Sequence, residues 1–186
     1  MRVCENGSQQ TAAYRVFSTS LGWMGIAGAG DCLQRLVVGY RSENAAESAL
    51  GESLLLDGES QGWQETLVGQ LTDYADGYPF DFSSVTVKTD HLTAFQKRVV
   101  RHCRRIPHGG TLSYGQLAAK AGSPGAARAV GQVMATNRVA IIVPCHRVVA
   151  ANGKLGGFSM PRGTEMKSRL LALEGAEAGA AAGDFS

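Results

Sequence analysis

Residues 113–134 read SYGQLAAKAGSPGAARAVGQVM, and this pattern predicts two short helices joined by a tight turn. Ser113 and Gln116 match a capping box, in which each residue satisfies a backbone donor of the other at the start of a helix. Gly122 would end this first helix. Ser123, followed by proline, would cap the second helix. Two short helices with so tight a connection form a helix-turn-helix.

The second of these helices, expected over residues 125–136, consists mostly of glycine and alanine around a single arginine, Arg128. Small residues let a helix backbone approach a partner closely, and they lack the long polar side chains that read base edges. A buried alanine-rich helix would have a similar composition, but an arginine with five donors and a permanent charge is hard to bury. The pattern favours a helix that fits a nucleic-acid groove without reading its sequence.

A basic helix is expected just upstream. Thr93 and Gln96 form another capping box, and apolar residues follow at helical spacing at positions 95, 99, 103 and 106. The first half of the chain has a different pattern, with strands expected over 14–17, 21–26 and 33–40, acidic helices over 43–56 and 63–74, and a linker over 80–90. That half forms a small α+β unit without recognisable chemistry.

Charge divides the chain in the same way. Residues 1–90 carry five Lys/Arg and twelve Asp/Glu, whereas residues 91–186 carry thirteen and four, so net charges of −7 and +9 underlie the overall +2. Chance clustering of solvated charges is one explanation. A basic half that meets a polyanion, beside an acidic half that the polyanion repels, is the other.

Composition excludes several classes of protein. No apolar run approaches the ~20 residues of a membrane span, and the N-terminus lacks the pattern of a secretion signal. The four cysteines, at positions 4, 32, 103 and 145, show no CxxC spacing, so neither a disulfide framework nor a zinc knuckle is expected. We therefore expect reduced thiols, no cofactor or metal, no membrane partner and a cytoplasmic location, or a nuclear one in a eukaryote.

A potential nucleophile lies beside a potential base in residues 144–149, PCHRVV, directly after the apolar run 141–143. Cys145 would attack as a thiolate, and an unperturbed thiol has a pKa of roughly 8.5, so His146 is a natural aid to deprotonation. Taken alone the pair is a weak signal, because free cysteines most often serve as small buried hydrophobes.

Together these motifs resemble the O6-alkylguanine-DNA alkyltransferases, a family of direct-reversal repair proteins. The resemblance covers roughly residues 90–176. It rests on ordered motifs at family-like spacing, namely SYGQLA at 113–118, AARAVG at 126–131, Asn137, IVPCHRVV at 142–149, GGF at 156–158 and LLALEG at 170–175.

The resemblance implies an α/β fold with two domains. A small N-terminal ribonuclease-H-like α+β domain over residues 1–85 would support a winged-helix-like C-terminal domain over residues 86–176, which contains the helix-turn-helix. Residues 177–186, rich in alanine and glycine, would form a disordered tail.

The resemblance also assigns the chemistry. Cys145 would accept the alkyl group, His146 would act as base through a water molecule, and Glu174 would orient the imidazole. Tyr114 would protonate the departing guanine, and Asn137 would be the hinge between the recognition helix and the cysteine strand. Because the thioether product has no easy hydrolytic exit, each molecule would react once.

The target atom is inaccessible inside a duplex, so the base must be flipped out. In the family an arginine finger, here Arg128, fills the gap, and Tyr114 crowds the phosphate of the target. The remaining DNA-facing residues would be Ser123, Ala126, Ala127, Ala129 and Gly131. The alkyl and base pocket would be lined by Met134, Pro144, Val148, Gly156, Gly157, Phe158 and Ser159. The partner would be double-stranded DNA carrying O6-alkylguanine, bound by a monomer.

The sequence departs from the family pattern at three places. Arg138 stands where proline is usual, residues 160–163 lengthen the pocket loop, and no histidine before His91 could complete an N-terminal zinc site. Two alternatives stay open: a non-catalytic lesion-binding protein of the alkyltransferase-like group, which lacks the acceptor cysteine, and a Cys-His hydrolase, which would leave the DNA-facing helix unexplained. Activity on O4-alkylthymine is open as well.

Overall fold

The computed structural model describes residues 12–51, 56–59, 64–151 and 153–176. The contacts divide the chain into two compact units. The first comprises residues 1–90 together with 138–140, and the second comprises residues 91–137 and 141–186. The expected tail, 177–186, lies outside the described residues.

A five-stranded sheet forms the first unit, in the order β4-β1-β2-β3-β5. The central strands β1 (Ala12–Thr19), β2 (Gly22–Ala29) and β3 (Cys32–Tyr40) pair antiparallel. The short outer strands β4 (Leu56–Glu59) and β5 (Thr86–Val87) pair parallel to β1 and β3. Because β1 to β3 are consecutive and joined by tight turns, this meander forms from local sequence alone.

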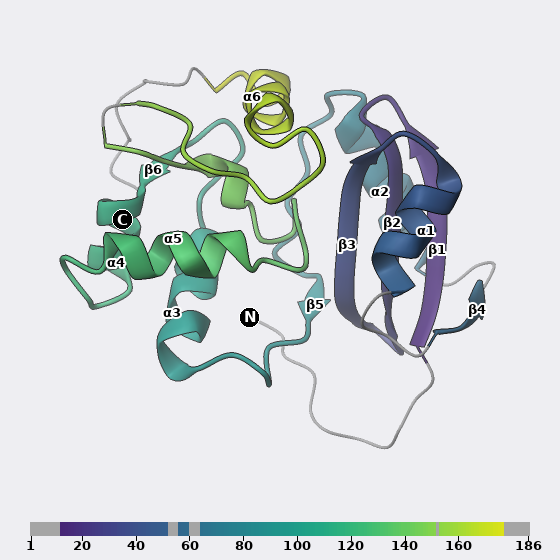
Figure 1. Cartoon of the computed structure of the whole chain (residues 1–186), viewed down its shortest axis with the longest axis horizontal. Coiled ribbons are helices and arrows are strands. Elements are labelled where there is room, and N and C mark those ends of the chain that lie inside the picture. The colour runs from purple at the N-terminus through teal and green to yellow at the C-terminus, as the bar shows by residue number, and fades with distance from the viewer. Residues whose placement is uncertain (1–11, 52–55, 60–63, 152, 177–186) are drawn as a thin grey trace. The chain divides into compact units, whose positions relative to one another are not determined.

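Helices α1 (Glu43–Gly51) and α2 (Glu65–Ala75) cover the sheet, and Figure 1 shows α1 in front of the strands and α2 behind them. Side chains of α1 pack on alternate residues of the strands, as the period of two requires. This core cluster comprises Val16, Ala27, Val37, Ala46 and Leu50.

The helix predicted over 43–56 is confirmed from Glu43 to Gly51, and its residues 52–55 lie outside the described part of the chain. Leu56, its predicted last residue, instead begins strand β4, which also contains Asp57 and Gly58. The predicted linker over 80–90 likewise contains β5. In β4 the edge of an existing sheet recruits residues of low strand propensity, because pairing with a formed strand outweighs the local preference, whereas Thr86 and Val87 of β5 are themselves residues that favour strands.

A segment distant in sequence completes the edge of this sheet. The backbone N–H of Leu36 donates to the carbonyl of Arg138 over 2.8 Å, and Leu36 forms a parallel bridge with Val139. Residues 138–140 therefore belong to the first unit although they directly follow the last helix-turn-helix residues. Local patterns could not predict this pairing, since it depends on the tertiary fold.

Helices dominate the second unit (Figure 1). They are α3 (Ala94–Cys103), α4 (Tyr114–Lys120), α5 (Ala127–Ala135) and α6 (Thr164–Leu173). Two short parallel strands, β6 (Leu112–Ser113) and β7 (Val148–Val149), link the start of α4 to the segment after the nucleophile. Both predicted capping boxes, at the starts of α3 and α4, are confirmed.

The second helix of the helix-turn-helix begins later than predicted. Ser123 does not cap it; its carbonyl accepts from the N–H of Ala126 in a turn, and α5 starts at Ala127. The reason is Gly125, whose φ of +87° lies outside the helical region. Gly125 therefore closes the turn and cannot belong to the helix.

The predicted α/β fold class is confirmed, with a mixed sheet in the N-terminal unit and a helical C-terminal unit. One expectation about the cysteines is wrong: Cys32 is disulfide-bonded, whereas Cys103 and Cys145 are free thiols. In the described part of the chain, no helix combines the length and apolar character needed to cross a bilayer.

Two glycines of the first unit give a test of its packing. A Cβ at Gly28 would lie 2.0 Å from the carbonyl oxygen of Cys32 across the β2–β3 hairpin, whereas a Cβ at Gly51 meets nothing within 4 Å. We expect Gly28→Ala to lower the free energy of unfolding by about 2 kcal/mol or more. Gly51→Ala should raise it by about 0.5 kcal/mol, because alanine restricts the unfolded chain. Urea unfolding measures both, and equal effects would contradict the packing of this hairpin.

Candidate active site

Cys145 lies on a single 3-10 turn, Cys145–Arg147 (η1), directly before β7. The predicted cysteine strand is therefore wrong, because Pro144 and the bond from the N–H of Cys145 to the carbonyl of Val143, 2.7 Å, bend the chain away from extended pairing. The thiol of Cys145 is buried on this turn.

Asn137 fixes the sulfur of Cys145. Its amide Nδ2 donates to Cys145 Sγ over 3.1 Å and to the carbonyl of Val143 over 2.9 Å. Asn137 lies two residues after the end of α5, so the segment that leaves the helix-turn-helix is hydrogen-bonded to the Cys145 sulfur. A donor to sulfur stabilises the thiolate more than the thiol.

His146 is completely buried beside the thiol, and its ring is oriented by Glu174. Nε2 lies 2.9 Å from Glu174 Oε1, and because a carboxylate only accepts, Nε2 must carry the proton. The opposite nitrogen, Nδ1, is buried without a hydrogen-bond partner among the described residues. His146 therefore holds an unused lone pair inside the site, as a general base requires.

Glu174 also accepts two bonds from Arg147. Arg147 Nε donates to Oε2 and Nη2 to Oε1, each over 2.8 Å, while Nη1 donates to the carbonyl of Ile106. Burial raises the pKa of Glu174, but the hydrogen bonds and charges of His146 and Arg147 outweigh it and hold that pKa well below its usual range. The carboxylate is therefore a permanent anion.

Burial raises the pKa of the Cys145 thiol, and the bond from Asn137 and the charge of Lys167 oppose this shift. Burial likewise lowers the pKa of His146. The resting pair is consequently a neutral thiol next to a neutral imidazole. The sequence motif suggested a thiol activated by its histidine, whereas burial favours the neutral thiol in the resting site.

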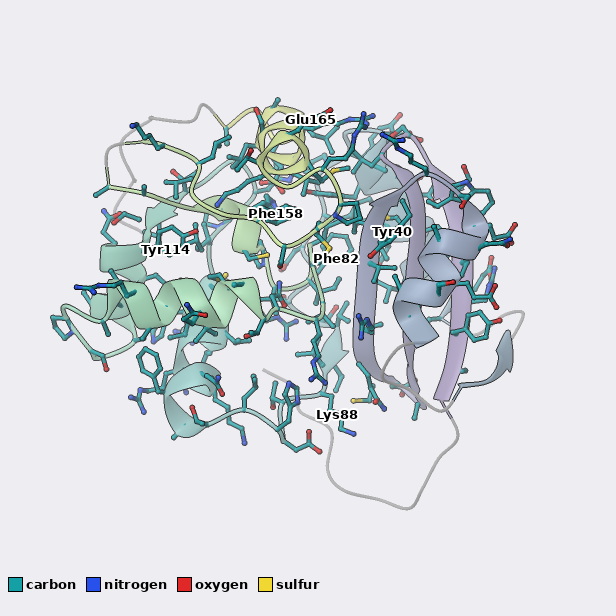
Figure 2. All side chains as sticks on the ribbon, viewed as in Figure 1. Tyr40, Phe82, Lys88, Tyr114, Phe158 and Glu165 are labelled. Atoms are coloured by element: carbon teal, nitrogen blue, oxygen red, sulfur yellow. The ribbon has the colours of Figure 1, made fainter. Side chains whose placement is uncertain are left out.

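Tyr114, the first residue of α4, lies above α5 in the view of Figure 2. A Cβ on Gly156 would come within 2.8 Å of its hydroxyl oxygen, and one on Gly131 would lie 4.0 Å from its ring. Burial, followed by the charge of Cys145, raises the pKa of Tyr114, so the phenol keeps its proton at neutral pH. Only a glycine at position 156 therefore leaves room for the ring of Tyr114.

Two residues of the site escaped the sequence analysis, Arg147 and Lys167. Arg147 is 6% exposed and Lys167 is fully buried. Lys167 Nζ donates to the carbonyl of Val148 and lies 5.7 Å from the ring centroid of Tyr114. The sequence does contain an indication that Lys167 is buried, because this lysine lies on the apolar face of α6 beside Met166 and Leu170.

The predicted pocket residues fall into two groups. Met134, Pro144 and Val148 are buried, whereas the loop residues Gly156, Gly157, Phe158 and Ser159 are partly or fully exposed. Phe158 lies in the same part of the second unit as Tyr114 (Figure 2). The longer loop closes in a turn, with the N–H of Gly163 donating to the carbonyl of Met160 over 2.9 Å. The turn leads directly into α6.

The predicted DNA-facing residues lie at the start of α5 and in the turn before it. Arg128 and Ala129 are exposed, and Ser123, Ala126, Ala127 and Gly131 are partly exposed. No ion pair involves Arg128 within the described residues. The exposed part of α5 therefore carries small side chains and one arginine, Arg128, that forms no ion pair within the described residues.

No group of three or more His, Cys, Asp or Glu side chains is placed to hold a metal ion, as far as the described residues show.

Comparison with known proteins agrees with this geometry. Residues 94–176 match the family model described as 6-O-methylguanine DNA methyltransferase, DNA binding domain. A methylated-DNA–protein-cysteine methyltransferase of Mycolicibacterium paratuberculosis is 51% identical over 120 residues, which is 61% of this chain and 70% of the relative.

Solved structures extend the similarity to both units. The crystal structure of Mycobacterium tuberculosis OGT in complex with DNA has a TM-score of 0.70 and 37% identity, and it covers 89% of this chain and 96% of that one. The O6-methylguanine-DNA methyltransferase of Pyrococcus kodakaraensis has a TM-score of 0.68 and 25% identity, over 89% and 100% of the two chains. The fold and site define a DNA-binding, cysteine-dependent repair protein. The chain belongs to the methylated-DNA–protein-cysteine methyltransferase family.

The buried ion pair gives a stability test. Glu174→Gln leaves the Arg147 charge uncompensated, so we expect a loss of about 3 kcal/mol in the free energy of unfolding at pH 7. The pKa of Glu174 is depressed, so its stabilisation is present above the unfolded carboxyl pKa of about 4.3 and is lost as the pH falls toward the folded value. Urea unfolding between pH 3 and 7 measures the effect.

Glu165→Gln is the matched control for this substitution. Glu165 pairs with Arg162 over 3.3 Å but its side chain is 69% exposed, so its removal should cost under about 1 kcal/mol. A Glu174→Gln variant as stable as this control would show that the buried network contributes nothing to the fold.

Proposed function

We propose that Cys145 accepts the alkyl group of O6-alkylguanine in duplex DNA, in a reaction that each protein molecule performs once. As a member of its family the protein is a DNA repair methyltransferase that transfers a methyl group to a cysteine. The observation that supports the assignment to Cys145 is the arrangement at its sulfur. Asn137 donates to Sγ, and the next residue is a buried imidazole with one nitrogen bonded to Glu174 and the other unused.

The transfer begins with proton removal from the thiol. Adjacent side chains rarely bond directly, so a bridging water carries the Cys145 proton to His146 Nδ1. The imidazolium that forms is stabilised by the Glu174 carboxylate 2.9 Å from Nε2. This arrangement generates a thiolate only when the substrate is in place, which agrees with the raised pKa of the resting thiol.

The thiolate then displaces the purine from the alkyl carbon. A C–S bond forms, the bond between that carbon and O6 breaks, and its electron pair stays on the purine. The hydroxyl of Tyr114 protonates the purine and afterwards regains a proton that originates from the thiol. The thioether offers no good leaving group to water, so the reaction stops after one transfer.

Base flipping makes the target atom accessible. Extrusion costs a few kcal/mol, and a side chain that fills the vacated stack offsets this cost. Arg128 is exposed at the start of α5 and has no ion-pair partner within the described residues, so its planar guanidinium is available for this role. The flanking alanines permit close approach of α5 to the groove, and the surplus of Lys/Arg after residue 90 attracts the phosphates.

Neither alternative explains these observations as well. A non-catalytic lesion-binding protein has no need of a cysteine, whereas here the thiol is held by Asn137 and flanked by a buried base. A Cys-His hydrolase predicts repeated turnover of esters or peptides. It gives no reason for a helix of small residues around one exposed arginine. The proposed substrate is therefore double-stranded DNA, bound by a monomer, and activity on O4-alkylthymine is a question for the same assay.

The first functional prediction concerns stoichiometry. On incubation with excess duplex that contains O6-methylguanine, the protein should gain the mass of one methyl group and then stop. Intact-mass measurement and peptide mapping should locate the methyl on Cys145. Cys145→Ser should bind the same DNA and gain no mass. Repeated turnover, or a methyl group on another cysteine, would disprove the assignment.

A second prediction separates extrusion from chemistry. Arg128→Ala should slow methyl transfer from duplex DNA strongly, by about 10-fold or more if the filled gap offsets over about 1.4 kcal/mol of unstacking. It should hardly affect reaction with the free base O6-benzylguanine, if the pocket admits it. Single-turnover rates measure both.

Arg128→Lys is the matched control, because lysine restores the charge without the planar group that stacks in the gap. It should regain only part of the rate. A lesion opposite an existing mismatch is easier to extrude, so the Arg128→Ala defect should shrink there. Equal losses on free base and duplex would mean that Arg128 maintains the fold.

A further inference from the structure

Lys167 is the charged residue of the site to which the reaction described above gives no role. It is fully buried on α6, and burial of an ammonium group costs free energy unless a partner offsets it. Among the described residues, its ammonium group donates a hydrogen bond to the carbonyl of Val148, a neutral acceptor. Its position therefore calls for an explanation beyond packing.

The buried charges around it do not balance. Among the described residues, Glu174 is the only buried carboxylate, and Arg147 occupies both of its oxygens. The pair is neutral, and His146 is neutral in the resting state because burial lowers its pKa. A protonated Lys167 consequently leaves one positive charge without a buried counter-ion in the described part of the site.

The groups that face Lys167 are the ones that become negative during alkyl transfer. Nζ lies 5.7 Å from the ring centroid of Tyr114 on α4, and it donates to the carbonyl of Val148, three residues after Cys145. The charge of Lys167 opposes the effect of burial on the pKa of the Cys145 thiol. The charge of Lys167 also acts on Cys103 of α3, but burial raises the pKa of that thiol strongly, so it stays neutral. Arg147 is a cation and His146 is neutral in the resting site, so neither contributes a further anion.

We propose that Lys167 is a positioning residue of the transfer reaction, whose buried ammonium group offsets the negative charge that passes from the Cys145 sulfur to the departing purine and holds the ring of Tyr114. The proposal rests on the function assigned to Cys145 above. No bond to Lys167 forms or breaks, and its proton stays in place. Its cation opposes the effect of burial on the thiol, so the thiolate forms more readily than in a neutral pocket of the same depth.

The charge state of Lys167 makes the proposal testable by pH. Burial lowers the pKa of Lys167 to about 8, so the ammonium form prevails at neutral pH and is lost as the pH rises through that value. The single-turnover rate of the unaltered protein should therefore hold level near pH 7 and fall above pH 8. The measurement is methyl transfer from O6-methylguanine duplex between pH 6 and 9.5.

Two substitutions of Lys167 predict different profiles. Lys167→Arg keeps a charge that does not titrate in this range, so its rate should stay level above pH 8. Lys167→Met removes the charge, and its rate at pH 7 should be lower by on the order of tenfold, the effect of one pKa unit on the thiol, with no fall above pH 8. Lys154→Met, a change at an exposed lysine of the same unit, is the control and should keep the original profile.

A reaction without DNA isolates the thiol. The rate of Cys145 modification by iodoacetamide, followed by peptide mapping, should show its pH midpoint moved upward in Lys167→Met. A merely structural lysine would leave this midpoint unchanged. If Lys167→Met does not fold, the transfer rate of Lys167→Arg above pH 8 still tests the proposal, because a level rate is expected for that variant.

The outcomes separate this proposal from the proposed function. If the unaltered protein takes no methyl group on Cys145, the function assigned to Cys145 is wrong. If it takes one, but Lys167→Arg falls above pH 8 like the unaltered protein, or Lys167→Met matches it at pH 7, the role of Lys167 alone is overturned.

Discussion

The buried carboxylate of Glu174 is the group on which the rest of the site depends, because it accepts hydrogen bonds from two consecutive residues of the turn that carries Cys145. One oxygen orients His146, and both accept from Arg147, whose third nitrogen reaches the carbonyl of Ile106. Glu174 also accepts from the N–H of Gly109 over 3.3 Å. The end of α6, the 3-10 turn and the loop after α3 are thereby joined around one anion. An ion pair of this depth adds little net stability, but its geometry is strongly specified, since breaking it leaves a buried charge unpaired.

The thiol of Cys145 is held by a neutral contact from Asn137. Asn137 bonds to the Cys145 sulfur and to the carbonyl of Val143, and the residues that follow Asn137 pair with the edge of β3 in the first unit. The helix that presents Arg128 therefore ends two residues before Asn137, the residue that contacts the thiol. The DNA-facing helix and the thiol are thus joined by one short segment. Asn137 lies in that segment, between the helix-turn-helix and Cys145.

Burial favours the neutral forms of the thiol and the imidazole, and three charged side chains modify that preference. Glu174 favours a protonated His146, Arg147 keeps Glu174 ionised, and Lys167 favours a thiolate at Cys145. A site arranged in this way protects the thiol from adventitious reaction in the resting protein. In the proposed reaction the thiol becomes reactive when a substrate excludes solvent and the proton moves to His146. If each molecule performs one transfer, as proposed, a resting state of low reactivity preserves the acceptor.

Local sequence was enough to predict the elements whose causes are local. The capping boxes at Thr93 and Ser113, the meander of β1 to β3 and the adjacency of Cys145 and His146 all depend on residues within a few positions of one another. Tertiary pairing was needed for the edge strand β4 over Asp57-Gly58, for the pairing of Leu36 with residues 138–140 and for the partners of Glu174. The charges of Arg147 and Lys167 are ordinary in sequence; they acquire their role because folding removes water from around them, and that desolvation depends on the whole of the second unit.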